Sequence, residues 1–263
     1  MKRLVITADD FGAAKEVNEA VEIAHRDGIL TAASLMVSAP AAADAVARAK
    51  TMPNLRVGLH LTLVDDRPTI PAAEIPGLVD RDGMFRSDMA RAGAAMFFLP
   101  AVRRQLAAEI EAQFRAFAST GLTLDHVNTH KHFHLHPTIA ALMFKIGNRY
   151  GMNATRVPFE TGNPFAQYLR RSYRAKGMCV AGRVYGLKWS GAMTKEHLGA
   201  ILDALPDGLS EIYMHPATGP YPGSAKGYRY REELAALTDI QIIEKIKSSG
   251  AVCGGFADFA AAH

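Results

Sequence analysis

The stretch Asn128-Thr129-His130-Lys131-His132-Phe133-His134-Leu135-His136-Pro137 decides the fold of this chain. Its histidines occupy alternate positions, and alternate side chains of an extended strand point to one face, so we expect all these imidazoles on one side. Residues 121–127, which precede the stretch, have the pattern of a turn followed by a buried strand. Pro137 then stops the strand and suits the first turn of a helix with an apolar face over residues 139–146. The pattern predicts histidines at the carboxyl end of a strand, where α/β proteins carry their chemistry.

A surface histidine run or an expression tag is the alternative interpretation of this stretch. A tag is terminal and contiguous, whereas this run is internal and alternates with Phe133 and Leu135. We therefore interpret the cluster as a basis for metal binding or acid–base chemistry, in which not every histidine needs to be a ligand.

The composition indicates a chain that can bury a sizeable core. It has 263 residues, 49% of them apolar, with a formal net charge of +4 and a pI near 9.1. No uninterrupted apolar run reaches the roughly 18 residues of a membrane-spanning helix, and no nucleic-acid-binding motif accompanies the basic excess. We therefore expect no transmembrane helix and no nucleic-acid partner. The first residues have the pattern of a strand rather than a secretory signal, and Cys179 and Cys253 suit free thiols, so the expected compartment is the cytoplasm.

Strand-like and helical patterns alternate along the chain at the spacing of βα units. No repeat or low-complexity linker interrupts them, so the sequence predicts one domain over residues 1–263. The predicted fold is α/β, a barrel-like arrangement of βα units with fewer than eight regular strands. Apart from the histidine run, strands are expected at residues 2–7, 30–37, 56–63, 153–158, 211–216 and 251–256, and helices at 17–23, 41–50, within 88–120, and at 196–205, 228–237 and 241–248.

Residues 165–189 have an unusual charge. They contain six basic residues and no acidic one, interleaved with apolar and aromatic side chains. Such an insert suits an anionic membrane surface or a lipid-bearing ligand. The alternative is an ordinary solvated helix whose apolar face is buried.

Polar groups stand at the carboxyl ends of several predicted strands: the pair Asp9 and Asp10, His60, the run that begins at His130, and His215. In a parallel βα barrel these ends converge on one mouth, so residues far apart in sequence meet there. One aspartate and two histidines can hold a divalent ion and leave positions open for water and substrate. The second aspartate can then act as a general base, and His215 can donate a proton to a leaving group.

Arg156 lies near the end of another predicted strand and is expected to pair with the aspartate that acts as the general base and keep it ionised. Each of these groups has a structural alternative when it is taken alone. Asp10 can cap a helix, His60 can be a hydrogen-bonded core histidine, and His215 can simply end a strand. Their convergence on one mouth favours the catalytic interpretation.

Four motifs resemble those of the YdjC-like carbohydrate deacetylase family, which includes the chitooligosaccharide deacetylases. They occur in family order and span nearly the whole chain. Within the family, the stretch NTHKHFHLHP is similar to the hopanoid-biosynthesis-associated branch called HpnK. The motifs are Thr7-Ala8-Asp9-Asp10-Phe11-Gly12, Gly58-Leu59-His60-Leu61-Thr62-Leu63, Thr129-His130-Lys131-His132-Phe133-His134 and Met214-His215-Pro216.

The resemblance implies a distorted (β/α) barrel, similar to the polysaccharide deacetylases, with one divalent ion such as Mg²⁺ or Zn²⁺ held by an aspartate and two histidines. Carried onto this chain, Asp10, His60 and His130 match the metal ligands. Asp9 matches the general base, and His215 matches the general acid.

His132 and His134 match further motif positions, for which the resemblance implies a role in supporting the ligands or facing the substrate. Two positions depart from the family pattern. Asn128 stands where many relatives have an aspartate, which lowers the local negative charge, and Ala217 stands where many have a glycine.

The branch implies a substrate in which N-acetylglucosamine is attached to a bacteriohopanetetrol lipid, and an activity that hydrolyses the acetamide. The insert at residues 165–189 fits a lipid substrate, as does the apolar run at residues 94–100, for which plain helix core is the alternative. We also expect peripheral contact with the inner membrane, and relatives suggest a homodimer.

Three other interpretations stay open. The same chemistry can act on soluble chitooligosaccharides, which have no need of a basic apolar insert. Histidine clusters at barrel mouths also build phosphoesterases, which hold two ions instead of one. A non-catalytic sugar- or lipid-binding subunit is the third, and the Asp9–Asp10 pair argues against it because binding alone needs no base beside a metal.

Overall fold

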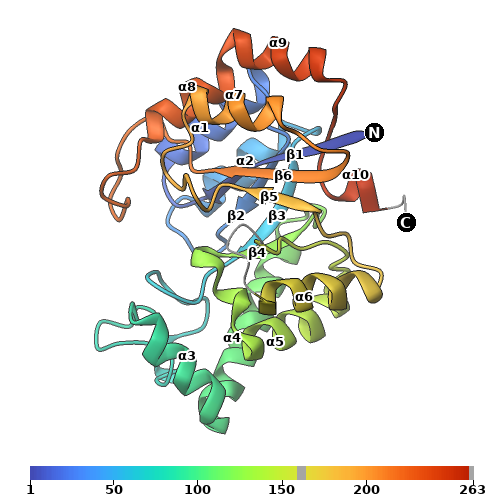
Figure 1. The fold of residues 1–263 in the computed structure, drawn as a ribbon. Coiled ribbons are helices and arrows are strands. Elements are labelled where there is room, and N and C mark those ends of the chain that lie inside the picture. The colour runs from blue at the N-terminus through green and yellow to red at the C-terminus, as the bar shows by residue number, and fades with distance from the viewer. Residues whose placement is uncertain (159–163, 261–263) are drawn as a thin grey trace.

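A parallel sheet of seven strands forms the centre of the computed structural model, which describes residues 1–158 and 164–260 (Figure 1). The strand order is β4-β3-β2-β1-β6-β5, and β7 pairs with β1, so the sheet curls into a half-barrel. The predicted α/β barrel-like fold with fewer than eight strands is therefore confirmed. The strands are β1 Lys2–Phe11, β2 Ala32–Leu35, β3 Arg56–Leu61, β4 Val127–Thr129, β5 Arg183–Tyr185, β6 Gly208–Met214 and β7 Val252–Cys253.

The first strand, β1, is the longest and pairs with β2, β6 and β7. Leu4, Val5 and Ile6 are fully buried, as expected for a parallel strand covered on both faces. The strand continues past the predicted residues 2–7 to Phe11. This extension carries Asp9 and Asp10 to the carboxyl edge of the sheet.

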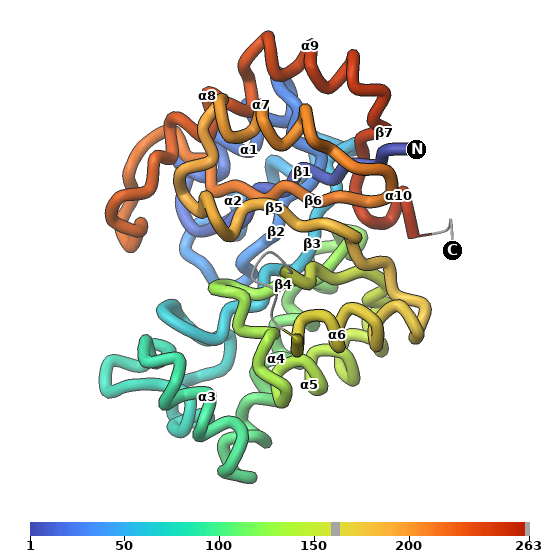
Figure 2. The backbone as a smooth tube through the Cα atoms, in the orientation of Figure 1, coloured from blue at the N-terminus to red at the C-terminus, as the bar shows by residue number. Residues whose placement is uncertain are grey.

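Helices cover the sheet on its outer side, with α7, α8 and α9 at one end of the molecule and α4, α5 and α6 at the other (Figures 1 and 2). Three of them begin at a proline, as predicted for α5. Two others begin where Asp88 or Asp239 accepts hydrogen bonds from free backbone N–H groups. The helices are α1 Lys15–Arg26, α2 Ala42–Lys50, α3 Met89–Phe98, α4 Pro100–Ser119, α5 Pro137–Gly147, α6 Pro164–Ala175, α7 Lys195–Asp203, α8 Tyr230–Thr238, α9 Ile240–Ser249 and α10 Ala257–Ala260, with short 3₁₀ turns at Ala72–Glu74, His130–Leu135 and Asn148–Tyr150.

The histidine run does not continue β4 as a strand, so the prediction that its imidazoles share one face is wrong. The strand ends at Thr129, and His130–Leu135 forms a 3₁₀ turn. Lys131 and His132 both have a φ of 53°, in the left-handed region that residues with a Cβ seldom adopt. The chain therefore turns at these two residues, and the four imidazoles point to different surroundings.

Two further expectations change in the structure. Residues 153–158 are not a strand, because Ala154 and Thr155 make only isolated bridges to Cys179 and Val127. Residues 165–189 supply most of α6 and all of β5, which pairs in parallel with β6, so part of this segment belongs to the sheet. Ala166, Leu169 and Tyr173 of α6 are buried, as expected for an ordinary solvated helix, whereas Tyr168 is exposed. Among the described residues, no helix combines the length and apolar character that crossing a bilayer requires.

A candidate metal and catalytic site

The carboxyl ends of β1, β3, β4 and β6 meet at one cavity of about 900 Å³. Strand register explains this convergence, because Ala8 is paired with Met214 and His60 with Asn128. The polar side chains that follow these positions therefore reach the same space. The cavity wall includes Asp9, Asp10, His60, His130, His132 and His215, together with Tyr221, Tyr228 and Tyr230.

Asp10, His60 and His130 form a compact triad. Oδ1 of Asp10 lies 3.2 Å from Nε2 of His60 and 3.1 Å from Nδ1 of His130, and the potential ligand atoms all lie within 4.8 Å of one another. In residues 1–158 and 164–260 this is the one group of three or more such side chains with metal-binding geometry. Two imidazoles and a carboxylate suit Zn²⁺ and other divalent ions and leave open positions, so the residues present fit a metal.

Electrostatics favour the charged forms within this triad. Burial raises the pKa of the Asp10 carboxyl, but His130 and His60 outweigh that effect and hold the pKa well below its usual range. Burial lowers the pKa of His130, yet the carboxylate of Asp10 beside it raises that pKa overall. The carboxylate is therefore ionised, as a metal ligand must be.

Asp9 and Asp10 both reach the cavity because β1 is irregular at this point. Successive side chains of a regular strand point to opposite faces. Here the register with β2 shifts between Ala8 and Phe11, and Asp10 has a φ of 62°. A left-handed residue in a strand costs roughly 1–2 kcal/mol. That local cost accompanies a turn that directs two adjacent carboxylates into one site.

The side-chain amide of Asn128 connects His60 to Asp9. Its Oδ1 lies 2.6 Å from Nδ1 of His60, so the imidazole donates there, and Nε2 is the nitrogen that faces Asp10. Its Nδ2 donates to Oδ1 of Asp9 at 3.1 Å and to Oγ of Ser34 at 2.9 Å. The neutral amide thus does what a carboxylate cannot do alone, since it accepts from one neighbour and donates to two others.

This hydrogen-bonded chain continues away from the cavity through buried residues. Oγ of Ser34 lies 2.9 Å from Nε2 of His126, and Nδ1 of His126 lies 2.8 Å from Oδ2 of Asp125. Asp125 also accepts from the backbone N–H groups of Phe256 and Ala257. These hydrogen bonds connect the site to the backbone at the start of α10.

Arg156 holds Asp9 in a fully buried ion pair. Nη1 lies 2.5 Å from Oδ2 of Asp9 and Nη2 lies 3.0 Å from Oδ1, so both carboxylate oxygens are engaged. The guanidinium also donates to Oε1 of Glu211, from Nε at 3.0 Å and from Nη2 at 2.8 Å, and it lies 4.1 Å from the centre of the Tyr213 ring. Burial raises the pKa of Asp9, but the charge of Arg156 prevails and holds that pKa far below its usual range.

His215, directly after β6, also lines the cavity. Its backbone N–H donates to Oε2 of Glu233 at 2.5 Å, and Oε1 of Glu233 accepts from the N–H of Met193. The ring lies against Tyr213 and Tyr228, and its Nδ1 is buried without a hydrogen-bond partner in the described part of the chain. An imidazole held in this way is available to a ligand in the cavity.

The remaining histidines of the run divide between the cavity and the core. His132 lines the cavity and bonds through Nε2 to the hydroxyl of Tyr213 at 2.8 Å. His134 is fully buried, with Nδ1 2.6 Å from Oγ1 of Thr129, and burial together with Arg156 lowers its pKa to about 3. His136 packs against Phe97 and Phe133. Only His132 among these three is placed to face a substrate.

Two acids at the site escaped the sequence analysis. Glu211 lies within β6 and is completely buried beside Arg156, and a single acid inside a strand that is otherwise apolar is the signal that could have identified it. Glu233 is also fully buried, and burial raises the pKa of its carboxyl. Because it follows Glu232 at the start of α8, the sequence gives it the appearance of an ordinary acid in a first helical turn.

Comparison with known proteins agrees with this geometry. Residues 3–248 match the family described as YdjC-like protein. The chain is 32% identical over 250 residues to a carbohydrate deacetylase of Geobacillus stearothermophilus, covering 94% of this chain and 93% of the relative. It is 36% identical over 247 residues to a carbohydrate deacetylase of Brevibacillus brevis, covering 93% and 94%.

The fold also has a close structural counterpart. A crystal structure from Enterococcus faecalis V583, of a protein provisionally assigned to cellobiose-phosphate cleavage, superposes with a TM-score of 0.83 over 98% of both chains at 23% identity. That similarity concerns the fold alone. The match to the family extends over residues 3–248, and the aspartate pair on β1 and the histidines of β3 and of the turn after β4 lie within it. The chain therefore belongs to the YdjC-like protein family.

Proposed function

We propose that this protein is a metal-dependent carbohydrate N-deacetylase, a hydrolase that removes the acetyl group from an N-acetylated sugar. The observation that carries the proposal is the division between the two neighbouring carboxylates of β1. Asp10 faces His60 and His130, whereas Asp9 is held by Arg156 and Asn128. One carboxylate is thus available to a cation and the other to a proton. The relatives from Geobacillus and Brevibacillus are named carbohydrate deacetylases, which supports the same chemistry.

Each proposed role follows from the position of a side chain. Asp10, His60 and His130 would hold one divalent ion, Mg²⁺ or Zn²⁺, which when bound supplies a Lewis acid that polarises the acetamide carbonyl. Asp9 accepts the proton of the attacking water, because Arg156 keeps the carboxylate ionised and fixes its orientation. His215 gives a proton to the departing sugar amine, and acetate leaves.

The residues around this core have supporting roles in the proposal. Arg156 is a positioning residue, since it is fully buried and touches Asp9 rather than the cavity. His132 faces the substrate, and His134 supports the turn that carries His130. The whole chain, residues 1–263, is proposed to form one deacetylase domain in which the basic and aromatic segment 165–189 contributes to the fold.

For the substrate we propose an N-acetylglucosaminyl lipid, the bacteriohopanetetrol-linked sugar of the HpnK branch, and with it a cytoplasmic enzyme at the inner membrane. The sequence of the histidine run supports the branch. A soluble chitooligosaccharide is the second candidate, because Tyr221, Tyr228 and Tyr230 give the cavity an aromatic wall on which sugar rings can stack. The phosphoesterase interpretation is weaker, since the described residues contain one metal-binding group and that chemistry uses two ions.

The experiment that tests the function is acetate release from two substrates in parallel, an N-acetylglucosaminyl hopanoid in detergent and diacetylchitobiose in buffer, each with and without a chelator. Chelator-sensitive release from the hopanoid alone is the expected result and supports both the chemistry and the branch. Release from chitobiose alone keeps the deacetylase and discards the lipid. If neither substrate releases acetate while metal is bound to the protein, the deacetylase proposal fails.

A further inference from the structure

The turn between α3 and α4 exposes an apolar surface at the end of the molecule opposite α9 (Figure 1). One residue, Leu99, joins the two helices, and the side chains of Phe97, Phe98 and Leu99 are 44%, 73% and 52% exposed. They are three of the eight exposed large hydrophobic residues in the described chain. We call Phe97, Phe98 and Leu99 the apolar tip. The alternative that residues 94–100 are plain helix core does not hold for these three.

Side-chain contacts and a hydrogen bond hold the apolar tip in place. The rings of Phe97 and Phe98 meet edge to face at 4.9 Å, and Arg103 donates from its guanidinium to the backbone carbonyl of Phe97. Phe97 also packs against His136, in the segment that begins with the ligand His130. Gly93 of α3 lets the helix approach this segment, because a Cβ there would lie 3.2 Å from the His136 ring. The tip is thereby tied to the turn that carries the site.

Positive charge surrounds the apolar tip. Residues 89–108 contain Arg91, Arg103 and Arg104, all exposed, and no acidic residue. Arg91 precedes Phe98 by seven residues, or about two turns, so both lie along one stripe of α3. Arg103 and Arg104 lie one turn after Pro100 on α4. Aromatic and aliphatic side chains amid guanidinium groups match the boundary between acyl chains and anionic headgroups.

We propose that the apolar tip and these three arginines dock the protein on an anionic lipid bilayer. A second copy of this chain is a poorer occupant, because a two-fold contact would bring three arginines of each copy together with Asp88 as the one acid in residues 88–108. Helix α6 is also a poorer docking face than the tip. Its apolar residues Ala166, Leu169 and Tyr173 are buried, and Tyr168 is its one large exposed hydrophobic side chain.

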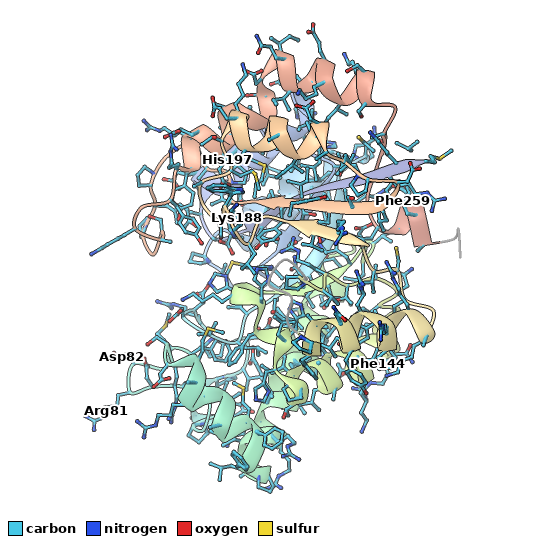
Figure 3. The ribbon with its side chains drawn as sticks, in the orientation of Figure 1. Arg81, Asp82, Phe144, Lys188, His197 and Phe259 are labelled. Carbon is cyan, nitrogen blue, oxygen red and sulfur yellow. The ribbon has the colours of Figure 1, made fainter. Side chains whose placement is uncertain are left out.

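The apolar tip is connected along the chain to the wall of the cavity. The loop before α3 supplies Asp65, Asp66, Arg67 and Met84 to the cavity wall and then leads directly into α3. Figure 3 marks Arg81 and Asp82 on this loop, on the same side of the molecule as α3. This inference rests on the proposed glycolipid substrate for its purpose, but lipid binding itself can be measured without any substrate.

The test is cosedimentation of the full chain with vesicles of phosphatidylcholine alone and with about one third phosphatidylglycerol, at low and high salt. Wild-type protein should bind the anionic vesicles and lose affinity as salt rises. The double variant Phe98→Ser, Leu99→Ser should bind at least tenfold more weakly, and Arg91→Glu with Arg104→Glu should do the same. Tyr168→Ser on α6 is the matched control and should bind like wild type.

Three results would overturn the proposal. The first is no binding of wild type to anionic vesicles, and the second is equal binding of wild type and the Phe98→Ser, Leu99→Ser variant. The third is a wild-type dimer in sedimentation velocity that the same variant converts to a monomer, since a second copy would then cover the tip. Thermal unfolding of the tip variants at the wild-type temperature shows that they are folded. Because vesicle binding is measured without substrate, a failure of docking is distinguished from a failure of the deacetylase function.

Discussion

Oδ1 of Asn128 lies 2.6 Å from Nδ1 of His60 across the pairing of β3 with β4. A neutral imidazole has one N–H proton. The hydrogen bond to Asn128 places that proton on Nδ1 and fixes the ring so that Nε2 faces Asp10. The same amide donates to Asp9, so one side chain orients a proposed metal ligand and the proposed base.

The first prediction concerns this amide. Asn128→Ala should weaken divalent metal binding by about 10–100-fold, because His60 loses the acceptor that fixes its tautomer and ring orientation. Asn128→Asp keeps an acceptor for His60 and should stay within about threefold of wild type on the same scale. Isothermal titration of the metal-free protein with Zn²⁺ measures both variants, and equal affinity of Asn128→Ala and wild type would contradict the proposed role.

A second prediction separates the two aspartates of β1. Asp9→Asn has the shape of wild type and leaves Asp10, His60 and His130 untouched, so metal content should be unchanged. Turnover should fall by about 10²–10⁴, because an amide cannot accept the proton of the attacking water. Metal analysis and the acetate assay on one preparation check both statements. His60→Ala is the opposite case and should lose metal, and a fully active Asp9→Asn enzyme would remove Asp9 as the base.

The third prediction is a dependence of stability on pH. The pKa of Asp125 is lowered: burial raises it, but His126 and the backbone N–H groups of Ala257 and Phe256 outweigh burial. A depressed folded-state pKa adds stability above the unfolded value of about 3.9, and that contribution is lost as pH falls through the lower folded pKa. Wild type should therefore lose stability below about pH 5 more steeply than Asp125→Asn.

At neutral pH the same variant should be less stable by about 1–3 kcal/mol, because two backbone donors and an imidazole lose a charged acceptor. Urea unfolding at pH 7 and at pH 3 gives both comparisons. If the free energies of unfolding of the two proteins fall equally with pH, ionisation of Asp125 does not contribute to the stability of the fold.

A fourth prediction uses two glycines. A Cβ at Gly58 would lie 2.5 Å from the His126 ring, which crosses β3 here to reach Ser34, so Gly58→Ala should destabilise by about 1–3 kcal/mol. Gly199 in α7 is the matched control, since a Cβ there meets only Ile242 at an ordinary 3.7 Å. Gly199→Ala should stabilise by roughly 0.5–1 kcal/mol because alanine favours a helix interior. Thermal unfolding of both variants measures the difference.

Residue types at strand ends made much of the site predictable. Asp10, His60 and His130 were expected to meet because parallel strands end at one edge, and they lie within 4.8 Å of one another. The pairing of Arg156 with Asp9 was also expected and is present. Their catalytic roles stay predictions that the experiments above address.

The local backbone explains what the sequence could not indicate. Left-handed residues are normally signalled by glycine or asparagine, and neither occurs at Lys131 and His132, where the histidine run turns. The sequence likewise contains no residue that signals the irregular backbone at Asp10. Glu211 and Glu233 depend on tertiary contacts with Arg156 and with the His215 backbone, which no spacing in the sequence encodes.

The placement of β1 between several partner strands has a consequence for how the protein can vary. Because β1 pairs with β2, β6 and β7, its amide hydrogens should be among the slowest to exchange with solvent, and the reactive carboxylates belong to this most protected unit. Tyr221 and Tyr228 of the cavity wall lie instead in the segment between β6 and α8, outside the sheet. Substitutions at these two positions can therefore change the cavity without changing a strand. A lineage of such enzymes can thus exchange one sugar for another while the chemistry of bond cleavage is inherited unchanged.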